Sequence, residues 1–485
     1  MFTTCELFGK FHSPRKPVSA FLHQVRHYPL HRLETLCATW ISAARLAPHE
    51  AGPHSRQRIF TPKLTFLTFL SQVLHPGASC RKAVGELQNY YLLQPEPRRI
   101  SGKTSPYCQA RLGLSLDTLV GIRNDLSQRM ARALPSDQWQ WERPVKVVDG
   151  STVSMPDSPE NQAEYPQTSS QKAGCGFPQI RLLALFSLDT GALLECTHGP
   201  CATSEVKLFH QVWSRLEAND LLLGDRLFGS YTTMARLFDQ GIDGIFRLNS
   251  QRDHDFRRGK RLGHHDRLMT WYKPRQKPAG LSDEEWAKVP AQIVVREVKV
   301  PISDPSCRVK EMVLVTTLLD PKKWSKARLA ALLARRWQVE LNLDDLKTSL
   351  QMDVLSCLSP AMIQRELQLH LIAFNLVRAL MLEASVSCHA PLYRLSFKGT
   401  LDRMEEFSQS MARVPRSHHQ KRLVLYQEML AAIAEDLVPL RPGRREPRCL
   451  KRRPKAYPFM TKPRRKMKDA PKSSRRKPKK HAVAN

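Results

Sequence analysis

Two aspartates stand where short apolar runs of the sequence end. Val145–Val148 is followed directly by Asp149, and Leu221–Leu223 is followed closely by Asp225. Apolar runs of this length predict buried strands, so each carboxylate would be held by the end of a rigid element. A carboxylate in such a place is a candidate for chemistry, although aspartate also follows strands because it makes turns. Taken one at a time, the turn role is the plainer interpretation.

A third acidic residue lies on a predicted helix between two basic residues. In the segment ALLARRWQVELNLDDLKTSL, Arg336, Glu340 and Lys347 stand at offsets of −4, 0 and +7. At about 100° per residue these positions fall within about 60° of one another, so one helical face presents a carboxylate between two cations. Spacing alone is equally typical of an exposed, salt-bridged helix face.

The charge of the chain indicates the kind of partner. The 485 residues include 76 Lys and Arg against 45 Asp and Glu, a formal net charge of +31. From Arg441 onward there are 19 Lys and Arg against two acids, so residues 441–485 contribute +17 and the first 440 residues carry +14. Both parts point to a polyanion as partner. Few apolar residues occur in the last 45, which predicts a basic disordered tail.

The elements around the three acids predict an α/β fold. Residues 1–140 have apolar residues at helical spacing and are expected to form a helical, DNA-binding domain. Strands are predicted at Val145–Val148, Ile180–Leu188, Ala192–Cys196, Leu221–Leu223 and Gly244–Leu248, with helices at Glu205–Leu216 and Met234–Gln240. Strands and helices in this order predict one mixed sheet.

The rest of the chain divides into three further parts. Residues 250–318 are rich in predicted strand and are expected to form an insertion within a catalytic domain of residues 141–390. Two long helices, at Ser325–Leu350 and Met362–Ala384, complete that domain. Residues 391–440 are predicted to be a C-terminal helical region before the tail.

Several features indicate the compartment. The 11 cysteines contain no CxxC pair, which is typical of free thiols in a reducing cytosol. The apolar stretch Leu367–Val377 is bounded by charged residues and is too short to span a bilayer. We therefore expect a cytoplasmic, nucleoid-associated protein with no membrane partner.

Ordered blocks of the sequence resemble DDE transposases of the bacterial insertion-sequence-four family. They are VVDGSTVSMPD at Val147–Asp157, YPQ…QKAGCGFPQIRL at Tyr165–Leu182, GDRLFGSY at Gly224–Tyr231, and VTTLLD at Val315–Asp320 followed by RRWQVELNLDDLKTSLQMDVL at Arg335–Leu355. The family signature Y-x2-R-x3-E-x6-K is matched at Arg336, Glu340 and Lys347. Leu333 stands where the tyrosine belongs, and Asp344 adds an acid one turn from Glu340.

The resemblance implies a ribonuclease-H-like core in which Asp149, Asp225 and Glu340 converge as catalytic metal ligands. Two Mg²⁺ ions, with Mn²⁺ as an alternative, can clamp the attacking and leaving oxygens of a phosphodiester and prefer carboxylate ligands. Arg336 and Lys347 would then bind phosphates near the cut. The implied function is a DNA transposase that cleaves at terminal inverted repeats and joins the 3′ ends to target DNA, acting as a homodimer in the DNA complex.

Other functions stay open from the sequence. The same acids could serve a nuclease that nicks DNA without strand transfer. A DNA-binding relative without catalysis is a further alternative, although the presence of all three acids counts against it. A nucleoid-type structural protein would account for the basic tail but not for the ordered α/β blocks.

Overall fold

The computed structural model describes most of the chain. The described residues are 40–47, 59–94, 96–134, 139–249, 251–252, 255–278, 281–302, 310–415, 417–440 and 459–468. The predicted disorder of residues 441–485 therefore falls mostly outside the described residues. Within that tail, the described residues 459–468 include one short helix, α15 (Arg464–Lys468).

A mixed sheet forms the centre of the molecule. Its first five strands are β1 (Val145–Ser154), β2 (Gln179–Ser187), β3 (Leu193–Pro200), β4 (Leu221–Gly224) and β5 (Asp243–Arg247). The sheet is antiparallel from β3 through β2 to β1 and parallel from β1 through β4 to β5. The order β3-β2-β1-β4-β5 is that of a ribonuclease-H-like core, so the expected α/β fold is confirmed.

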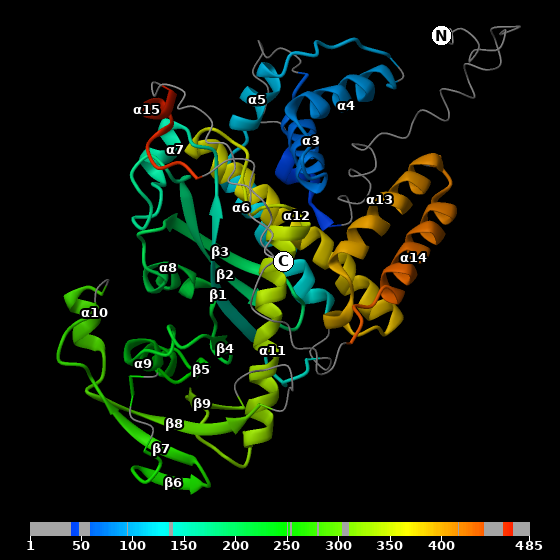
Figure 1. Ribbon diagram of the computed structural model, residues 1–485. Coiled ribbons are helices and arrows are strands. Elements are labelled where there is room, and N and C mark those ends of the chain that lie inside the picture. Colours follow the sequence, from blue (N-terminus) through cyan, green and yellow to red (C-terminus); the bar gives the residue numbers. More distant parts are fainter. Residues whose placement is uncertain are drawn as a thin grey trace, which may run out of the picture.

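The predicted β-rich insertion extends this sheet. Its strands are β6 (Lys260–Gly263), β7 (Asp266–Tyr272), β8 (Gln292–Pro301) and β9 (Glu311–Thr316), with the short helix α10 (Asp283–Lys288) between β7 and β8. Strand β9 pairs antiparallel with β5, so the described strands form one nine-stranded sheet in the order β3-β2-β1-β4-β5-β9-β8-β7-β6. The insertion is thus built onto the edge of the core (Figure 1).

Helices cover both faces of the sheet (Figure 1). On one face, α8 (Glu205–Val212) and α9 (Tyr231–Asp239) pack in a core that includes Val148 of β1. On the other face, α11 (Lys326–Asp344) and α12 (Pro360–Cys388) pack in a core that includes Val147. Side chains alternate along a strand, so adjacent residues of β1 point to different helical layers.

Helix α12 is longer than the sequence pattern predicted. It has 29 residues, and by length and composition alone it could cross a membrane, with a mean hydropathy of 1.5 in its most apolar window. Within the molecule 72% of that window is buried, because α6, α3 and α14 pack around it. Its apolar surface is therefore covered by other helices of the same chain, as expected of the central helix of a core.

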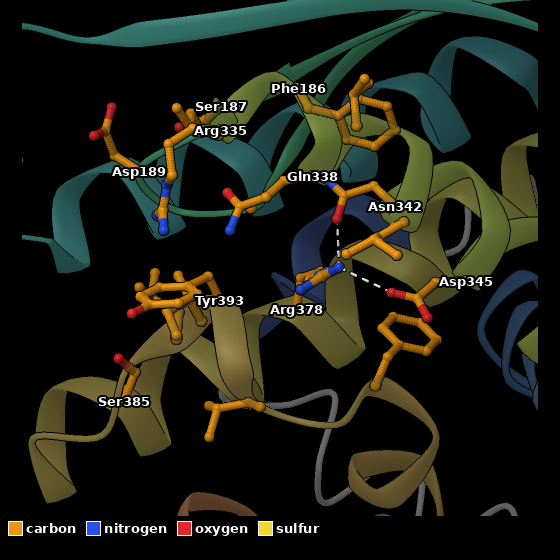
Figure 2. Close-up of a pocket in the computed structure, with 18 of the residues that line it drawn as sticks. Phe186, Ser187, Asp189, Arg335, Gln338, Asn342, Asp345, Arg378, Ser385 and Tyr393 are labelled. Atoms are coloured by element: carbon orange, nitrogen blue, oxygen red, sulfur yellow. Dashed lines mark hydrogen bonds and ion pairs between the residues drawn. The ribbon is translucent and has the colours of Figure 1, made fainter. Parts of the chain in front are cut away.

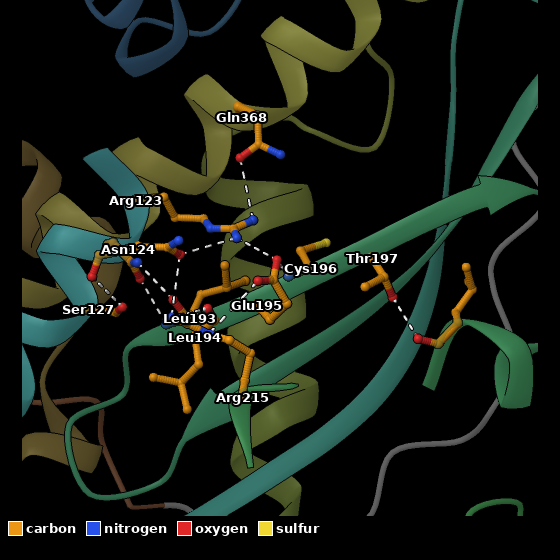
Figure 3. Close-up of polar contacts among 12 residues, drawn as sticks. Arg123, Asn124, Ser127, Leu193, Leu194, Glu195, Cys196, Thr197, Arg215 and Gln368 are labelled. Carbon is orange, nitrogen blue, oxygen red and sulfur yellow. Dashed lines mark hydrogen bonds and ion pairs between the residues drawn. The ribbon is translucent and has the colours of Figure 1, made fainter. Parts of the chain in front are cut away.

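The helices before and after the sheet gather around α12, either directly on it or through a neighbouring helix. They are α3 (Pro62–Leu74), α4 (Cys80–Leu92), α5 (Ser105–Leu112) and α6 (Leu116–Ala133) before it, and α13 (Phe397–Arg413) and α14 (His419–Glu435) after it, while α7 (Pro159–Glu164) follows β1. Figure 3 shows how α6 is joined to the sheet. The buried Arg123 of α6 donates to Glu195 of β3 at 2.5 Å and to Gln368 of α12 at 3.4 Å. A buried guanidinium without partners would destabilise the folded state, so these hydrogen bonds hold α6 against the sheet and α12.

Candidate active site

The register of two parallel strands places Asp149 and Asp225 side by side. Val147 of β1 pairs with Leu223 of β4, so the two aspartates, each two residues further on, lie at the same level. Neighbouring strands are about 4.8 Å apart, so the two residues are neighbours, and the Asp225 charge acts on Asp149. The predicted strand ends at Val148, but β1 continues to Ser154 because Asp149–Ser154 pair with β2. Asp149 therefore lies within a strand, and only Asp225 follows a strand end.

Helix α11 brings Glu340 and Arg336 to Asp149. Arg336 Nη2 donates to Glu340 Oε1 at 2.9 Å, one turn along the helix. Its Nη1 lies 3.7 Å from Asp149 Oδ2, so the guanidinium bridges the two carboxylates. The side chains of Arg336, Asp149 and Glu340 are 21%, 24% and 37% exposed, which leaves all three reachable from solvent. The predicted face of α11 is thus directed at the aspartates of the sheet.

The environment of Asp149 disfavours its negative charge. Burial is the largest cause that raises the pKa of Asp149, and the nearby carboxylates of Glu340 and Asp225 raise it further. The Gly150 amide, which donates to Asp149 Oδ1 at 2.8 Å, and the Arg336 guanidinium oppose this rise in the pKa. A carboxylate in this setting is stabilised by any additional cation placed beside it.

Lys347 reaches the same strand from a different kind of helix. α11 passes at Asp345 into a π-helical segment, Asp345–Ser349, which the regular helical spacing did not predict. Lys347 Nζ lies 3.4 Å from Ser151 Oγ, two residues beyond Asp149 on the same face of β1. Segments of π-helix are frequent at functional sites because they rotate the following side chains out of the α-helical pattern.

The opposite side of α11 borders a cavity of about 470 Å³ (Figure 2). Arg378 of α12 enters it, donates to Asn342 and bonds Asp345 at 2.9 Å, where the π-helical segment begins. Burial raises the pKa of Asp345 to about 6. Because Arg378 fixes the first residue of the segment, it positions the turn that presents Lys347.

The predicted residues are brought together as pairs and do not enclose a common point. Asp149, Arg336 and Glu340 are in contact, Asp225 lies beside Asp149, and Lys347 contacts β1 through Ser151. Among the described residues, no group of three or more His, Cys, Asp or Glu side chains is close enough to hold a metal ion. The place between Asp149 and Glu340 is taken by the guanidinium of Arg336, which is itself a cation.

Comparisons with known proteins identify the family. A family model described as "Transposase DDE domain" matches residues 140–376. The transposase InsG for insertion sequence element IS4 of Escherichia coli K12 is 26% identical over 368 residues, which cover 73% of this chain and 78% of that protein. The chain belongs to the DDE transposases of the insertion-sequence-four family.

Two further proteins are similar to this transposase. The putative transposase InsZ of Escherichia coli K12 is 29% identical over 123 residues, covering 25% of this chain and 41% of the relative. A cryo-EM structure of the piggyBac transposase synaptic complex with hairpin DNA overlaps 85% of each chain at a TM-score of 0.37 and 10% identity. That structural likeness is too weak to carry an inference about this site.

The two departures from the family signature lie away from the acids. In this transposase Leu333 is half-buried and packs against the main hydrophobic core. The additional acid, Asp344, is exposed and accepts from Thr348 Oγ1 at 2.8 Å. Neither side chain contacts Asp149, Asp225 or Glu340 in the described part of the chain.

Sequence reasoning missed the contribution of Arg378. The residue interrupts the apolar run of α12, and its side chain is almost fully buried beside Asn342 and Asp345. An arginine within the apolar run of this helix was the available indication, since buried arginines need an acceptor or an acid nearby.

Proposed function

We propose that this transposase binds the ends of its element, cleaves them by metal-dependent phosphodiester hydrolysis and joins the 3′ ends to target DNA. The observation that supports the proposal is that Asp149 and Asp225 lie at the same level of two adjacent parallel strands, and that Arg336 of α11 links Asp149 to Glu340. These acids come from elements that are far apart in sequence, which supports a shared role for them. By the family resemblance, the protein acts as a homodimer on DNA in the bacterial cytoplasm, at the nucleoid.

The donor chemistry fits a divalent cation. Asp149, Asp225 and Glu340 offer carboxylate oxygens, which Mg²⁺ and Mn²⁺ prefer. Burial, and to a lesser degree the charges of Glu340 and Asp225, raise the pKa of Asp149, so a cation beside it would stabilise its charged form. The chemistry that two such ions supply when bound is activation of the attacking oxygen and stabilisation of charge on the phosphate. In the structure Arg336 forms ion pairs with both Asp149 and Glu340. For these two carboxylates to bind the same metal ion, Arg336 would have to move away from Glu340.

DNA offers Arg336 another acceptor. A guanidinium binds phosphate oxygens in the same forked manner in which it binds carboxylates. We infer that Arg336 moves from Glu340 to a phosphate near the cut, and that Lys347 binds a neighbouring phosphate as a point charge. The basic body of the protein, +14 over the first 440 residues, would hold the DNA beside them.

Charge removal from the acids tests the proposal. Asp149→Asn, Asp225→Asn and Glu340→Gln should each abolish Mg²⁺-dependent cleavage of end DNA, because each nearly preserves volume but loses the charge that holds a cation. Cleavage is measured on labelled end duplexes, and folding by circular dichroism and the unfolding midpoint.

Asp344→Asn is the matched control, because this acid lies on α11 but faces Thr348. It should cleave at the wild-type rate. Near wild-type cleavage in any of the three variants would remove that residue from the site. If the wild-type protein nicks end DNA but never joins it to a target duplex, the nicking-nuclease alternative holds instead.

A further inference from the structure

Gly150, the residue after Asp149, has no side chain, and the carboxylate of Glu205 occupies the space beside it. A Cβ at Gly150 would lie 2.9 Å from the carboxyl carbon of Glu205 and 3.0 Å from its Oε1. Gly150 is not among the glycines with positive φ, so its backbone does not by itself demand glycine. Glycine is needed at position 150 because the Glu205 carboxylate lies directly against β1 and occupies the space of a side chain.

The Glu205 carboxylate is half-buried and has no partner among the described residues. No hydrogen bond or ion pair joins it to the rest of the described chain, whereas the half-buried Glu195 bonds Arg123 and the buried Glu297 bonds Arg267, each at 2.5 Å. Carboxylates taken from water are normally paired, hydrogen-bonded or bound to a metal. The Glu205 carboxylate, beside the residue that follows Asp149, is therefore available to bind a cation.

The edge of β1 allows groups from both faces to meet. Strand β4 pairs with β1 only as far as Val147, and the next partner on that side is Val354, opposite Ser154. Between these points no strand in the described part of the chain pairs with β1 on its β4 side. Asp149 lies on the face of β1 that α11 covers, and Glu205, the first residue of α8, lies against Gly150 on the opposite face.

We propose that Glu205 is a fourth carboxylate of the metal site and binds a divalent cation together with Asp149 and Asp225. This inference rests on the proposed function, because it assumes that the two aspartates hold such an ion. The ion would draw these side chains inward, since no three acids of the described chain form a metal site as they stand. An oxygen-only set of this kind suits Mg²⁺ or Mn²⁺.

Calorimetric titration of the DNA-free, full-length protein with Mn²⁺ tests this role without an activity assay. Glu205→Gln should weaken Mn²⁺ binding at least about tenfold, and Asp149→Asn should weaken it as much or more. Glu160→Gln is the matched control, because it removes the same charge from the first turn of α7, and it should bind Mn²⁺ like the wild type.

The possible outcomes separate the two proposals. Wild-type Mn²⁺ affinity in Glu205→Gln together with a loss in Asp149→Asn would overturn the role of Glu205 and leave the proposed function standing. Wild-type affinity in Asp149→Asn as well would overturn the metal site itself.

A double-mutant cycle gives an independent test. Gly150→Ala should weaken Mn²⁺ binding to a similar degree, because its methyl group must displace the Glu205 carboxylate. In a Glu205→Ala background the same change should have no further effect, since the clash is gone. An effect of Gly150→Ala that is equal in both backgrounds would contradict the contact on which the inference stands.

Discussion

Arg336 and Lys347 are the two residues whose roles depend most on what surrounds them. Arg336 bonds the acids of the site, and Lys347 bonds a hydroxyl of β1, so both are held where the proposed DNA backbone passes. Arg336→Ala and Lys347→Ala should each weaken binding of end DNA and lower the slope of log affinity against log salt by about one unit. The measurement is a salt titration of binding to an end duplex.

Arg335→Ala is the control for this pair. Arg335 is the neighbour of Arg336 on α11, but its guanidinium lies 4.2 Å from the ring centre of Tyr393, beside the cavity of Figure 2. Its removal should leave the salt slope unchanged. An unchanged slope for both Arg336 and Lys347 would instead favour an ordinary salt-bridged helix face.

At the scale of elements, the turn between β2 and β3 fixes the start of β1. Asp189 Oδ2 accepts from the Val145 amide at 3.0 Å, and burial raises the pKa of Asp189 from 3.8 to about 6. A raised folded-state pKa means that the folded protein binds this proton more tightly. Protonation of Asp189 therefore stabilises the folded state. This contribution to the free energy of unfolding is complete below about pH 4 and is lost as the pH rises through 6.

Asp189→Asn should remove this pH dependence. The amide oxygen can still accept from Val145, and no charge has to be buried. The variant should match the wild type at pH 4 and exceed its free energy of unfolding by up to about 2 kcal/mol at pH 7. Urea unfolding of both proteins at several pH values measures the difference. A difference that stays constant from pH 4 to pH 7 would show that the titration of Asp189 is not its cause.

At the scale of the whole molecule, the charge is divided between a folded body and a basic tail. Truncation after Leu440 removes +17 and leaves +14. Such a segment has few apolar groups with which to recognise bases, so affinity for end DNA and for random DNA should fall by similar factors. The loss should shrink at high salt, because counterion release drives this binding.

Salt titrations on both duplexes, with and without the tail, measure these factors. Cleavage at saturating DNA should survive truncation, since the proposed catalytic residues all precede the tail. A selective loss of end-DNA binding would make the tail part of sequence recognition.

Local sequence pattern was enough to predict the strand and helix types, and the resemblance to a known family selected the candidate acids among them. Apolar runs located the five core strands and the helix that carries Glu340, and the ordered blocks pointed to Asp149, Asp225, Arg336 and Lys347. Net charge indicated a polyanion. Strand and helix periodicity and net charge depend only on the residue types along a short stretch of chain, so they can be read from the sequence alone.

Only the tertiary structure decided how these parts meet. The continuation of β1 past Asp149 depends on pairing with β2, and the joining of the insertion to the core depends on β9 pairing with β5. The π-helical segment is fixed by Asp345, which bonds a buried arginine of another helix, and the glycine after Asp149 faces an acid of α8. Each of these results is set by a partner far away in sequence, so no local pattern could predict it.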